Sequence, residues 1–181
     1  MNANSTMLVA ALTVDDVLPY RALMLEAYAG EPDAFTSTSQ ERAAEPESWW
    51  VRRVADPNAM SVVFGAFHGR DLMGTVALEF SAKPKTRHKA HLIGMYVKPG
   101  ARGAGAGRSL ASAALGYLKG RSEIASVVLT VTQGNESAIR LYRALGFSEF
   151  GTEPMAICTS SGYKAKVHMW REVGHHGEIV D

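Results

Sequence analysis

The sequence lacks several features that would assign it to a specialised class of protein. Its one cysteine, Cys158, cannot form an internal disulfide, and a metal cluster held by cysteines is excluded for the same reason. No apolar run approaches the roughly 18 to 20 residues that a membrane-spanning helix needs. The short apolar stretch Met7–Leu12 runs into two aspartates and has no Lys or Arg before it, unlike a signal peptide. We therefore expect a cytoplasmic protein that needs no metal.

An excess of charge of one sign is also lacking. The 19 Lys and Arg residues balance 18 Asp and Glu residues, so the formal net charge is +1. With this balance the protein has no strong positive potential to attract nucleic acid or an anionic membrane surface, and we expect neither as a partner. The 181 residues, 46% of them apolar, are enough for one domain with a substantial core.

Strand-like and helix-like segments alternate along the chain. We expect one domain over residues 1–173, followed by a flexible tail, 174–181. Periodicity and end signals predict helices over residues 13–29, 39–54 (interrupted near Pro46), 105–119 and 135–145. Stretches rich in Val, Ile, Leu and Phe predict strands over residues 7–12, 59–68, 71–81, 91–97, 125–132, 147–153 and 163–171. The expected fold class is therefore α/β of the α+β type, with a mixed and mostly antiparallel sheet.

The most informative segment is a glycine-rich stretch, residues 95–110 (MYVKPGARGAGAGRSL), which follows an apolar strand and opens a helix. Alternating Gly and Ala let backbone N–H groups crowd toward one point, and a helix N-terminus adds partial positive charge. Arg102 and Arg108 add full charges. A tight turn alone would need only one glycine, so the pattern predicts a phosphate or diphosphate site.

Two familiar phosphate motifs do not fit this stretch. A Rossmann fingerprint requires G-x-G-x-x-G, but counted from Gly103 the last glycine position holds Arg108. A P-loop requires G-x-x-x-x-G-K-[ST], but its first glycine falls on Arg102 and its lysine on Arg108. A nucleotide-phosphate enzyme that uses the loop differently is kept as an alternative.

The glycine-rich stretch resembles the coenzyme A loop of the GNAT superfamily of N-acetyltransferases. That loop reads Arg or Gln, two residues, Gly, one residue, then Gly or Ala, and Arg102, Gly105 and Gly107 match it. A second block, residues 135–147 (NESAIRLYRALGF), is similar to the family's Asn-x-x-Ala-x-x-Leu-Tyr-x-x-x-Gly-Phe helix. The two blocks are in the family's order, one strand apart, and the clear resemblance covers about residues 91–151.

The resemblance implies both a fold and an activity. The fold would be GNAT-like, with a sheet of about six to seven strands that splays at its centre, flanked by about four helices. The activity would be direct transfer of an acetyl group from acetyl-CoA to a primary amine through a tetrahedral intermediate, without a metal. The acceptor would be a small-molecule amine or a protein amino group, and a homodimer is possible. The alternative is a non-catalytic coenzyme A sensor of the same fold.

The resemblance also implies which residues hold acetyl-CoA. Its pantetheine arm would lie in the splay and bond to the backbone of Met95, Tyr96 and Val97. The Val97 N–H would donate to the thioester carbonyl and to the oxyanion that forms from it. Asn135 would cap its helix, contact the arm, or do both. The remaining implied contacts come from Arg102, Gly103, Ala104, Gly105, Ala106, Gly107, Arg108, Ala138 and Tyr142.

Three residues are candidates for proton transfer. The resemblance makes Tyr142 the general acid for the departing thiolate, whereas its pattern alone would favour a core tyrosine. An attacking amine must be neutral, so a base is needed. The position that carries a glutamate in some family members is His91 here, which can accept a proton near neutral pH, and Glu79 on the preceding strand is the competing candidate.

The acceptor pocket is expected on the other side of the splay, between the N-terminal helices and the last strands. Acidic residues in it would suit a cationic amine. The candidates for its lining are Glu26, Tyr28, Asp33, Trp49 and Tyr163.

Overall fold

The computed structural model describes residues 7–174, which form one seven-stranded sheet in the order β1-β2-β3-β4-β5-β7-β6. The expected flexible tail lies outside the described residues, apart from its first residue. The strands are β1 (Leu8–Ala11), β2 (Ser61–His68), β3 (Asp71–Phe80), β4 (Lys89–Val97), β5 (Ser126–Thr132), β6 (Ser148–Thr159) and β7 (Gly162–Glu172). The helices are α1 (Val17–Gly30), α2 (Ser39–Ala43), α3 (Glu47–Val54), α4 (Ala106–Lys119) and α5 (Glu136–Ala144), with short 3-10 turns at Val14–Asp16, Pro32–Ala34 and Pro99–Ala101.

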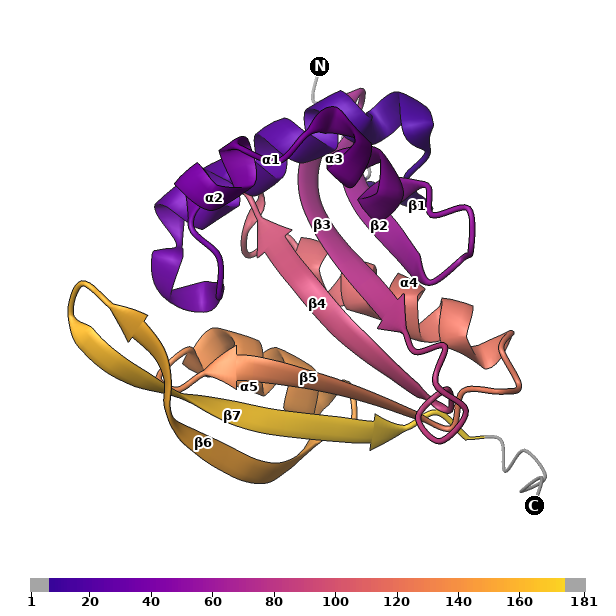
Figure 1. Ribbon diagram of the computed structural model, residues 1–181, viewed down its shortest axis with the longest axis vertical. Coiled ribbons are helices and arrows are strands. Elements are labelled where there is room, and N and C mark those ends of the chain that lie inside the picture. Colours follow the sequence, from indigo (N-terminus) through magenta and orange to yellow (C-terminus); the bar gives the residue numbers. More distant parts are fainter. Residues whose placement is uncertain (1–6, 175–181) are drawn as a thin grey trace.

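Helices cover both faces of the sheet (Figure 1). Helices α1 and α3 pack on β2 and β3 from one side, whereas α4 packs on β2, β3 and β4 from the other. The first face buries Leu23, Met24 and Trp50 against the sheet, and the second buries Leu110 and Leu118. Two apolar cores therefore fix the sheet, and through it the strand ends that carry the glycine-rich loop.

The sheet opens at its centre. Strands β4 and β5 are parallel and pair only at their first residues, Lys89–His91 with Ser126–Val128. Figure 1 shows the two strands together at one end and spread apart at the other. All other neighbouring strands are antiparallel and paired over most of their length. The predicted mixed sheet with a central splay is confirmed.

One detail of the sequence prediction is corrected by the structure. Strand β6 was expected to end at Glu153, before Pro154, but it continues to Thr159. Because β6 is the edge strand, Pro154 breaks no ladder on its free side. The register slips between Glu153 and Ile157 instead, where Met155 has a φ of 52°.

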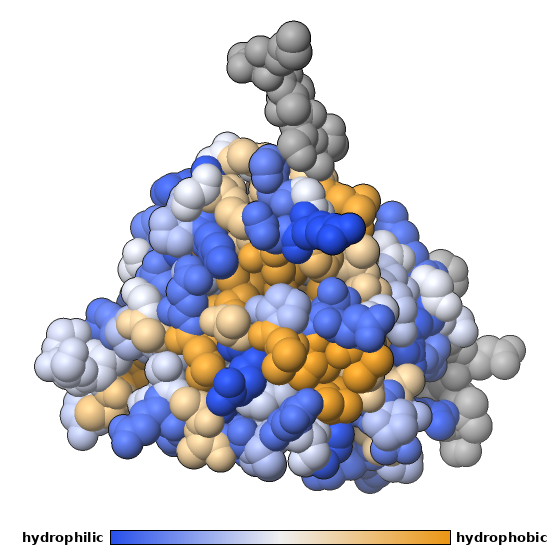
Figure 2. Space-filling view, turned by 90° about the horizontal axis from the view of Figure 1, so that it is seen from above, coloured by the Kyte–Doolittle hydropathy of each residue, from blue (hydrophilic) through white to orange (hydrophobic). Residues whose placement is uncertain are grey.

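Helix α1 buries one face against the sheet. Tyr20 and Ala27 are buried, whereas Leu18 is 70% exposed. Seen from the α1 side, the surface carries hydrophobic residues among hydrophilic ones (Figure 2). Over residues 7–174, no helix has both the length and the apolar character needed to cross a membrane.

Candidate functional site

The glycine-rich loop joins β4 to α4 and needs glycine at two positions. Gly103 and Gly105 have φ angles of 79° and 85°, in the left-handed region where a side chain is strained. Gly105 is the N-cap of α4, whose first turn is Ala106 onward. The alternating glycines thus turn the chain sharply while keeping its backbone bare.

This turn leaves a group of hydrogen-bond donors unused. Among the described residues, none of the six N–H groups of residues 103–108 makes a hydrogen bond of good geometry, and the first helical bond runs from the Ser109 N–H to the Gly105 carbonyl. Gly103, Ala104, Gly105 and Arg108 are exposed. A helix start with several free N–H groups carries partial positive charge and is suited to bind an anion.

The Arg102 side chain is held away from these donors. Its Nε donates to the Val97 carbonyl at 2.9 Å, and one Nη forms an ion pair with Glu31 at 2.8 Å. The guanidinium also lies 5.7 Å from the centroid of the Tyr96 ring. In this arrangement Arg102 braces the loop against β4 and α1, so the free N–H groups and Arg108 provide the exposed positive charge.

A bulge in β4 sets which backbone groups face the splay. Thr75 is opposite Tyr96 but Ala77 is opposite Ile93, so Gly94 and Met95 together face one residue of β3, and Gly94 has a φ of 62°. Farther along, the Lys98 N–H donates to the Met73 carbonyl at 2.8 Å.

Because antiparallel bonding alternates residue by residue, the Val97 N–H faces away from β3 and into the opening. The Val97 carbonyl points the same way, since it accepts from Arg102. The same alternation turns the backbone of Tyr96 toward β3, and the Tyr96 side chain is buried with its hydroxyl donating to Glu26 at 3.0 Å.

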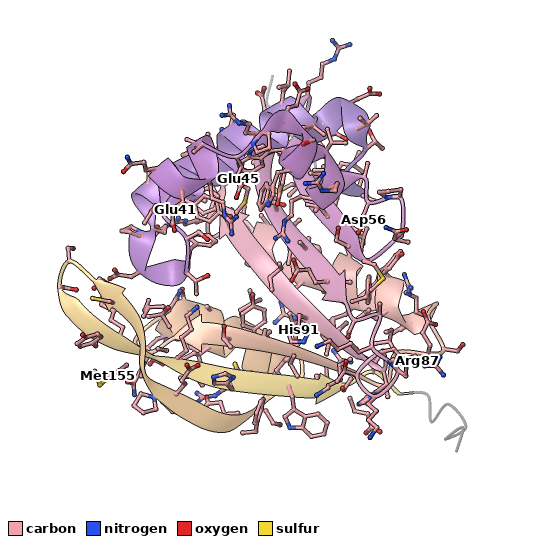
Figure 3. All side chains as sticks on the ribbon, viewed as in Figure 1. Glu41, Glu45, Asp56, Arg87, His91 and Met155 are labelled. Atoms are coloured by element: carbon pink, nitrogen blue, oxygen red, sulfur yellow. The ribbon has the colours of Figure 1, made fainter. Side chains whose placement is uncertain are left out.

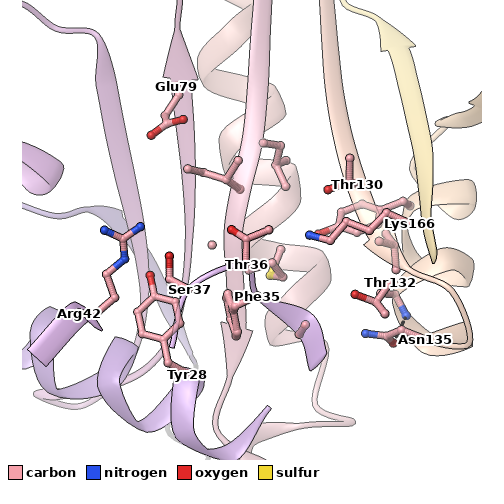
Figure 4. Close-up of a pocket in the computed structure, with 18 of the residues that line it drawn as sticks. Tyr28, Phe35, Thr36, Ser37, Arg42, Glu79, Thr130, Thr132, Asn135 and Lys166 are labelled. Carbon is pink, nitrogen blue, oxygen red and sulfur yellow. Dashed lines mark hydrogen bonds between the residues drawn. The ribbon is translucent and has the colours of Figure 1, made fainter. Parts of the chain in front are cut away.

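A pocket of about 390 Å³ passes through the splay (Figure 4). One part of its lining comes from β4, β5 and α5: Leu92, Ile93, Gly94, Met95, Thr130, Val131, Thr132, Asn135, Ala138 and Tyr142. The other part comes from the N-terminal helices, β3 and β7: Tyr28, Ala34, Phe35, Thr36, Ser37, Arg42, Arg53, Glu79 and Lys166. This volume is sufficient for a small ligand.

Helix α5 places two of the predicted residues at the pocket. Asn135 caps the helix, its Oδ1 accepting from the Ala138 N–H at 3.2 Å. The structure thus has the predicted cap. Asn135 also lines the pocket, so its contact with the pantetheine arm stays a prediction.

Tyr142 is only 4% exposed, with its ring edge-on to Phe147. Its hydroxyl makes no hydrogen bond to a described residue. Burial raises the pKa of the Tyr142 phenol well above its usual value, so the group keeps its proton.

The two candidate bases are direct neighbours. Glu79 on β3 is paired in register with His91 on β4, so both side chains extend from the same face of the sheet. Glu79 lines the pocket and forms an ion pair with Arg53. His91 is exposed, lies where β4 still pairs with β5 (Figure 3), and is not among the lining residues.

The acidic residues expected at the acceptor side are engaged elsewhere. Glu26 accepts from the Tyr96 hydroxyl and lies 3.6 Å from the Lys98 Nζ, and Asp33 forms an ion pair with Lys164. Of the five candidates, Tyr28 lines the pocket, whereas Trp49 lines a separate hollow beside α3 and Tyr163 is 64% exposed.

Several lining residues carried no signal in the sequence. Arg42 and Arg53 lie on helices α2 and α3, where a charged residue is ordinary. Lys166 alternates with buried Val167 and Met169 along β7, a pattern typical of any solvent-facing strand position. Only the folding of α2 and α3 over the opening brings these residues together.

The family model described as "Acetyltransferase (GNAT) family" matches residues 23–147. The matched range begins in α1 and includes the glycine-rich loop and the whole of α5. It therefore contains both sequence blocks and most of the pocket lining.

Among curated proteins, the chain is similar to mycothiol acetyltransferases. It is 32% identical over 130 residues to that of Rhodococcus jostii, covering 70% of this chain and 40% of that protein. It is 32% identical over 139 residues to that of Salinispora arenicola, covering 76% of this chain and 42% of that protein. The chain thus spans about two-fifths of the length of these relatives.

Solved structures share the fold. A GNAT superfamily phosphinothricin acetyltransferase from Sinorhizobium meliloti, in complex with acetyl-CoA, superposes with a TM-score of 0.82 at 19% identity, covering 97% of this chain and 92% of that one. The yncA protein from Salmonella typhimurium, with its cofactor acetyl-CoA, gives a TM-score of 0.79 at 18% identity, covering 97% and 99%. Together with the family match over residues 23–147, the splayed sheet and the bare loop lead to one conclusion: the chain belongs to the acetyltransferase (GNAT) family.

Proposed function

We propose that this chain transfers an acetyl group from acetyl-CoA to a primary amine. The observation that carries the proposal is the set of six free N–H groups at residues 103–108, at the start of α4 and beside the opening between β4 and β5. A diphosphate bound there would direct the attached arm into the opening. No other part of the described chain combines a bare helix start with a gap in the sheet.

The residues present fit the coenzyme. The diphosphate would accept from the N–H groups of residues 103–108, with Arg108 near enough in sequence to add a charge. The pantetheine arm would enter the opening along the free edge of β4, at Met95 to Val97, as an added strand does. Ala138 and Asn135 would contact it from α5, and Pro99, which has no N–H, would only shape the entry to the loop.

When bound, acetyl-CoA supplies the thioester whose C–S bond breaks as the amine forms a C–N bond with the acetyl carbon. The Val97 N–H stabilises the negative charge that develops on the carbonyl oxygen. Tyr142 donates a proton to the departing sulfur, for which its hydroxyl is available because it has no other partner among the described residues and burial, which raises its pKa, keeps it protonated. Glu79 accepts the proton of the amine. Its position in the pocket lining favours it over its cross-strand neighbour His91, which is not among the lining residues.

The relatives support the reaction class. Those compared above are named acetyltransferases, and the two solved neighbours contain acetyl-CoA according to their descriptions. Because this chain spans about two-fifths of the mycothiol acetyltransferases, their acceptor is not carried over to it.

Two measurements test the proposal. Calorimetry should give saturable acetyl-CoA binding, and a panel of amines should cause release of free coenzyme A thiol. Binding without release from any amine would instead favour the sensor. Glu79→Gln should lower the rate at neutral pH far more than His91→Gln, and the reverse order would assign the base to His91.

A further inference from the structure

The half of the pocket that faces the N-terminal helices is rich in positive charge. Arg42 on α2, Arg53 on α3 and Lys166 on β7 line it, whereas Glu79 is the one carboxylate in the described lining. Figure 4 shows Lys166 reaching in from the strand side and Arg42 lying on the helix side with Tyr28. The charge is thus opposite to that expected for a pocket that accepts a simple cationic amine.

Of the three cations, Lys166 has its positive charge least balanced by nearby carboxylates. It is 9% exposed and extends from the face of β7 opposite buried Val167, and within residues 7–174 no carboxylate lies within 4.0 Å of its amino group. Its cross-strand partner Glu153 is bonded to His168 at 3.1 Å. Burial lowers the pKa of Lys166, an effect that Glu153 only partly offsets.

Arg42 is also incompletely satisfied. Its Nε is buried with no hydrogen-bond partner among the described residues, and its only ion pair is a long contact with Glu45 at 3.4 Å. The guanidinium is stacked 4.5 Å from the centroid of the Trp49 ring, which fixes its orientation. By contrast, Arg53 is occupied by Glu79. Lys166 is thus a buried cation without a paired carboxylate among residues 7–174, and the Arg42 Nε is a buried donor without an acceptor there, so an anion in the pocket would satisfy both.

We propose that the acceptor is a small amine with a carboxylate next to its amino group, an α-amino acid, and that Lys166 and Arg42 hold the carboxylate. The inference rests on the proposed function and specifies its substrate class. Arginine and lysine pair with carboxylate through strong charge-assisted hydrogen bonds. Glu79 then faces the amino group, so the pocket separates the two charges of the amino acid.

A hydrogen bond beside the pocket joins its strand side to its helix side. Thr132, the cross-strand partner of Lys166, donates from its Oγ1 to the Asp33 carbonyl at 2.6 Å. This bond ties β5 to the turn that precedes α2. Arg42 and Lys166 line the same pocket of about 390 Å³ from its two sides (Figure 4), and this size suits a compact acceptor better than an extended chain.

The test compares L-amino acids with their primary amides, which have the same side chain and amino group but no carboxylate. Thiol release is measured with acetyl-CoA at saturation, and rates are expressed per neutral amine. For the best pair, kcat/KM should be at least 10-fold higher for the acid. Lys166→Met and Arg42→Gln should each reduce this acid-to-amide ratio on the order of 10- to 100-fold, the effect of losing one charge-assisted hydrogen bond. Lys119→Met, which removes an exposed charge from α4, is the matched control and should leave the ratio unchanged.

The following results would overturn the inference, and the last of them would also refute the proposed function. An acid-to-amide ratio near one, or a ratio that Lys166→Met and Arg42→Gln leave intact, overturns the inference while the proposed function stands. A dipeptide preferred over both free acid and amide also overturns it, because its carboxylate lies farther from the amine. Acetyl-CoA binding with no thiol release from any amine refutes the proposed function itself, and the inference with it.

Discussion

Gly105→Ala isolates the contribution of the loop to coenzyme binding. Gly105 has a φ of 85°, so alanine there is strained by about 1 to 2 kcal/mol. A Cβ added at this position meets no atom within 4 Å, so packing adds nothing to the cost. In a domain of this size 1 kcal/mol corresponds to about 2–4 °C, so the melting temperature without ligand should fall by about 2 to 8 °C.

Gly69 provides the matched control. It lies in the turn between β2 and β3 with a φ of 61°, and a Cβ there also meets no atom within 4 Å. Gly69→Ala should therefore destabilise the protein to the same extent. The two variants differ in that only residue 105 lies among the free N–H groups of residues 103–108.

The dissociation constants for acetyl-CoA should differ between Gly105→Ala and Gly69→Ala. A methyl group at position 105 that displaces one charge-assisted hydrogen bond should weaken acetyl-CoA about 10- to 150-fold, whereas Gly69→Ala should stay within about twofold of the parent. Gly105→Asp, which adds a like charge, should bind more weakly still. Calorimetry gives the constants and thermal unfolding gives the stabilities. Equal dissociation constants in Gly105→Ala and Gly69→Ala, with equal losses of stability, would refute the loop assignment.

Three further predictions follow from the pocket. Tyr142→Phe should lower kcat on the order of 100-fold with little change in acetyl-CoA affinity. Because burial raises the pKa of this phenol above 10.0, ionisation of Tyr142 should cause no alkaline loss of kcat below pH 10, and such a loss that disappears in the variant would contradict its assignment. Lys166→Met should stabilise the protein by about 1 kcal/mol at pH 7 in urea unfolding, because it removes a poorly paired buried cation. Since the pKa of Lys166 is lowered in the fold, this gain should shrink as pH rises toward 10.5, where the unfolded lysine also loses its proton; a gain that grows with pH would be wrong in sign. Asn135→Ala should cost about 1 kcal/mol of stability through the lost cap, whereas Asn135→Ser should restore stability without restoring coenzyme affinity if the amide contacts the arm.

The sequence was sufficient for the parts of the fold that depend on local chemistry. The glycines at 103 and 105 were identified as a turn into a helix because only glycine adopts that backbone freely, and the structure has both in the left-handed region. The seven strands and the long helices follow from their periodicity. Pro46 was expected to interrupt a helix, and α2 and α3 are indeed separated there.

What could not be predicted depends on contacts between distant segments. Nothing local indicates that β7 inserts between β5 and β6, or that Arg102 turns back to the Val97 carbonyl and Glu31. Of the acidic candidates for the pocket lining, Glu26 lies beside Lys98 and Asp33 pairs with Lys164, and these partners come from distant segments. Arg42 and Lys166 are far apart in sequence, and only the tertiary fold brings them to one cavity.

The most direct test of the central claim is a crystal structure with acetyl-CoA bound. The account predicts diphosphate oxygens about 2.7 to 3.2 Å from backbone nitrogens of residues 103–108, and a thioester oxygen at the same distance from the Val97 nitrogen, with the arm between β4 and β5. A diphosphate bound elsewhere, or an arm that leaves this opening empty, would contradict it.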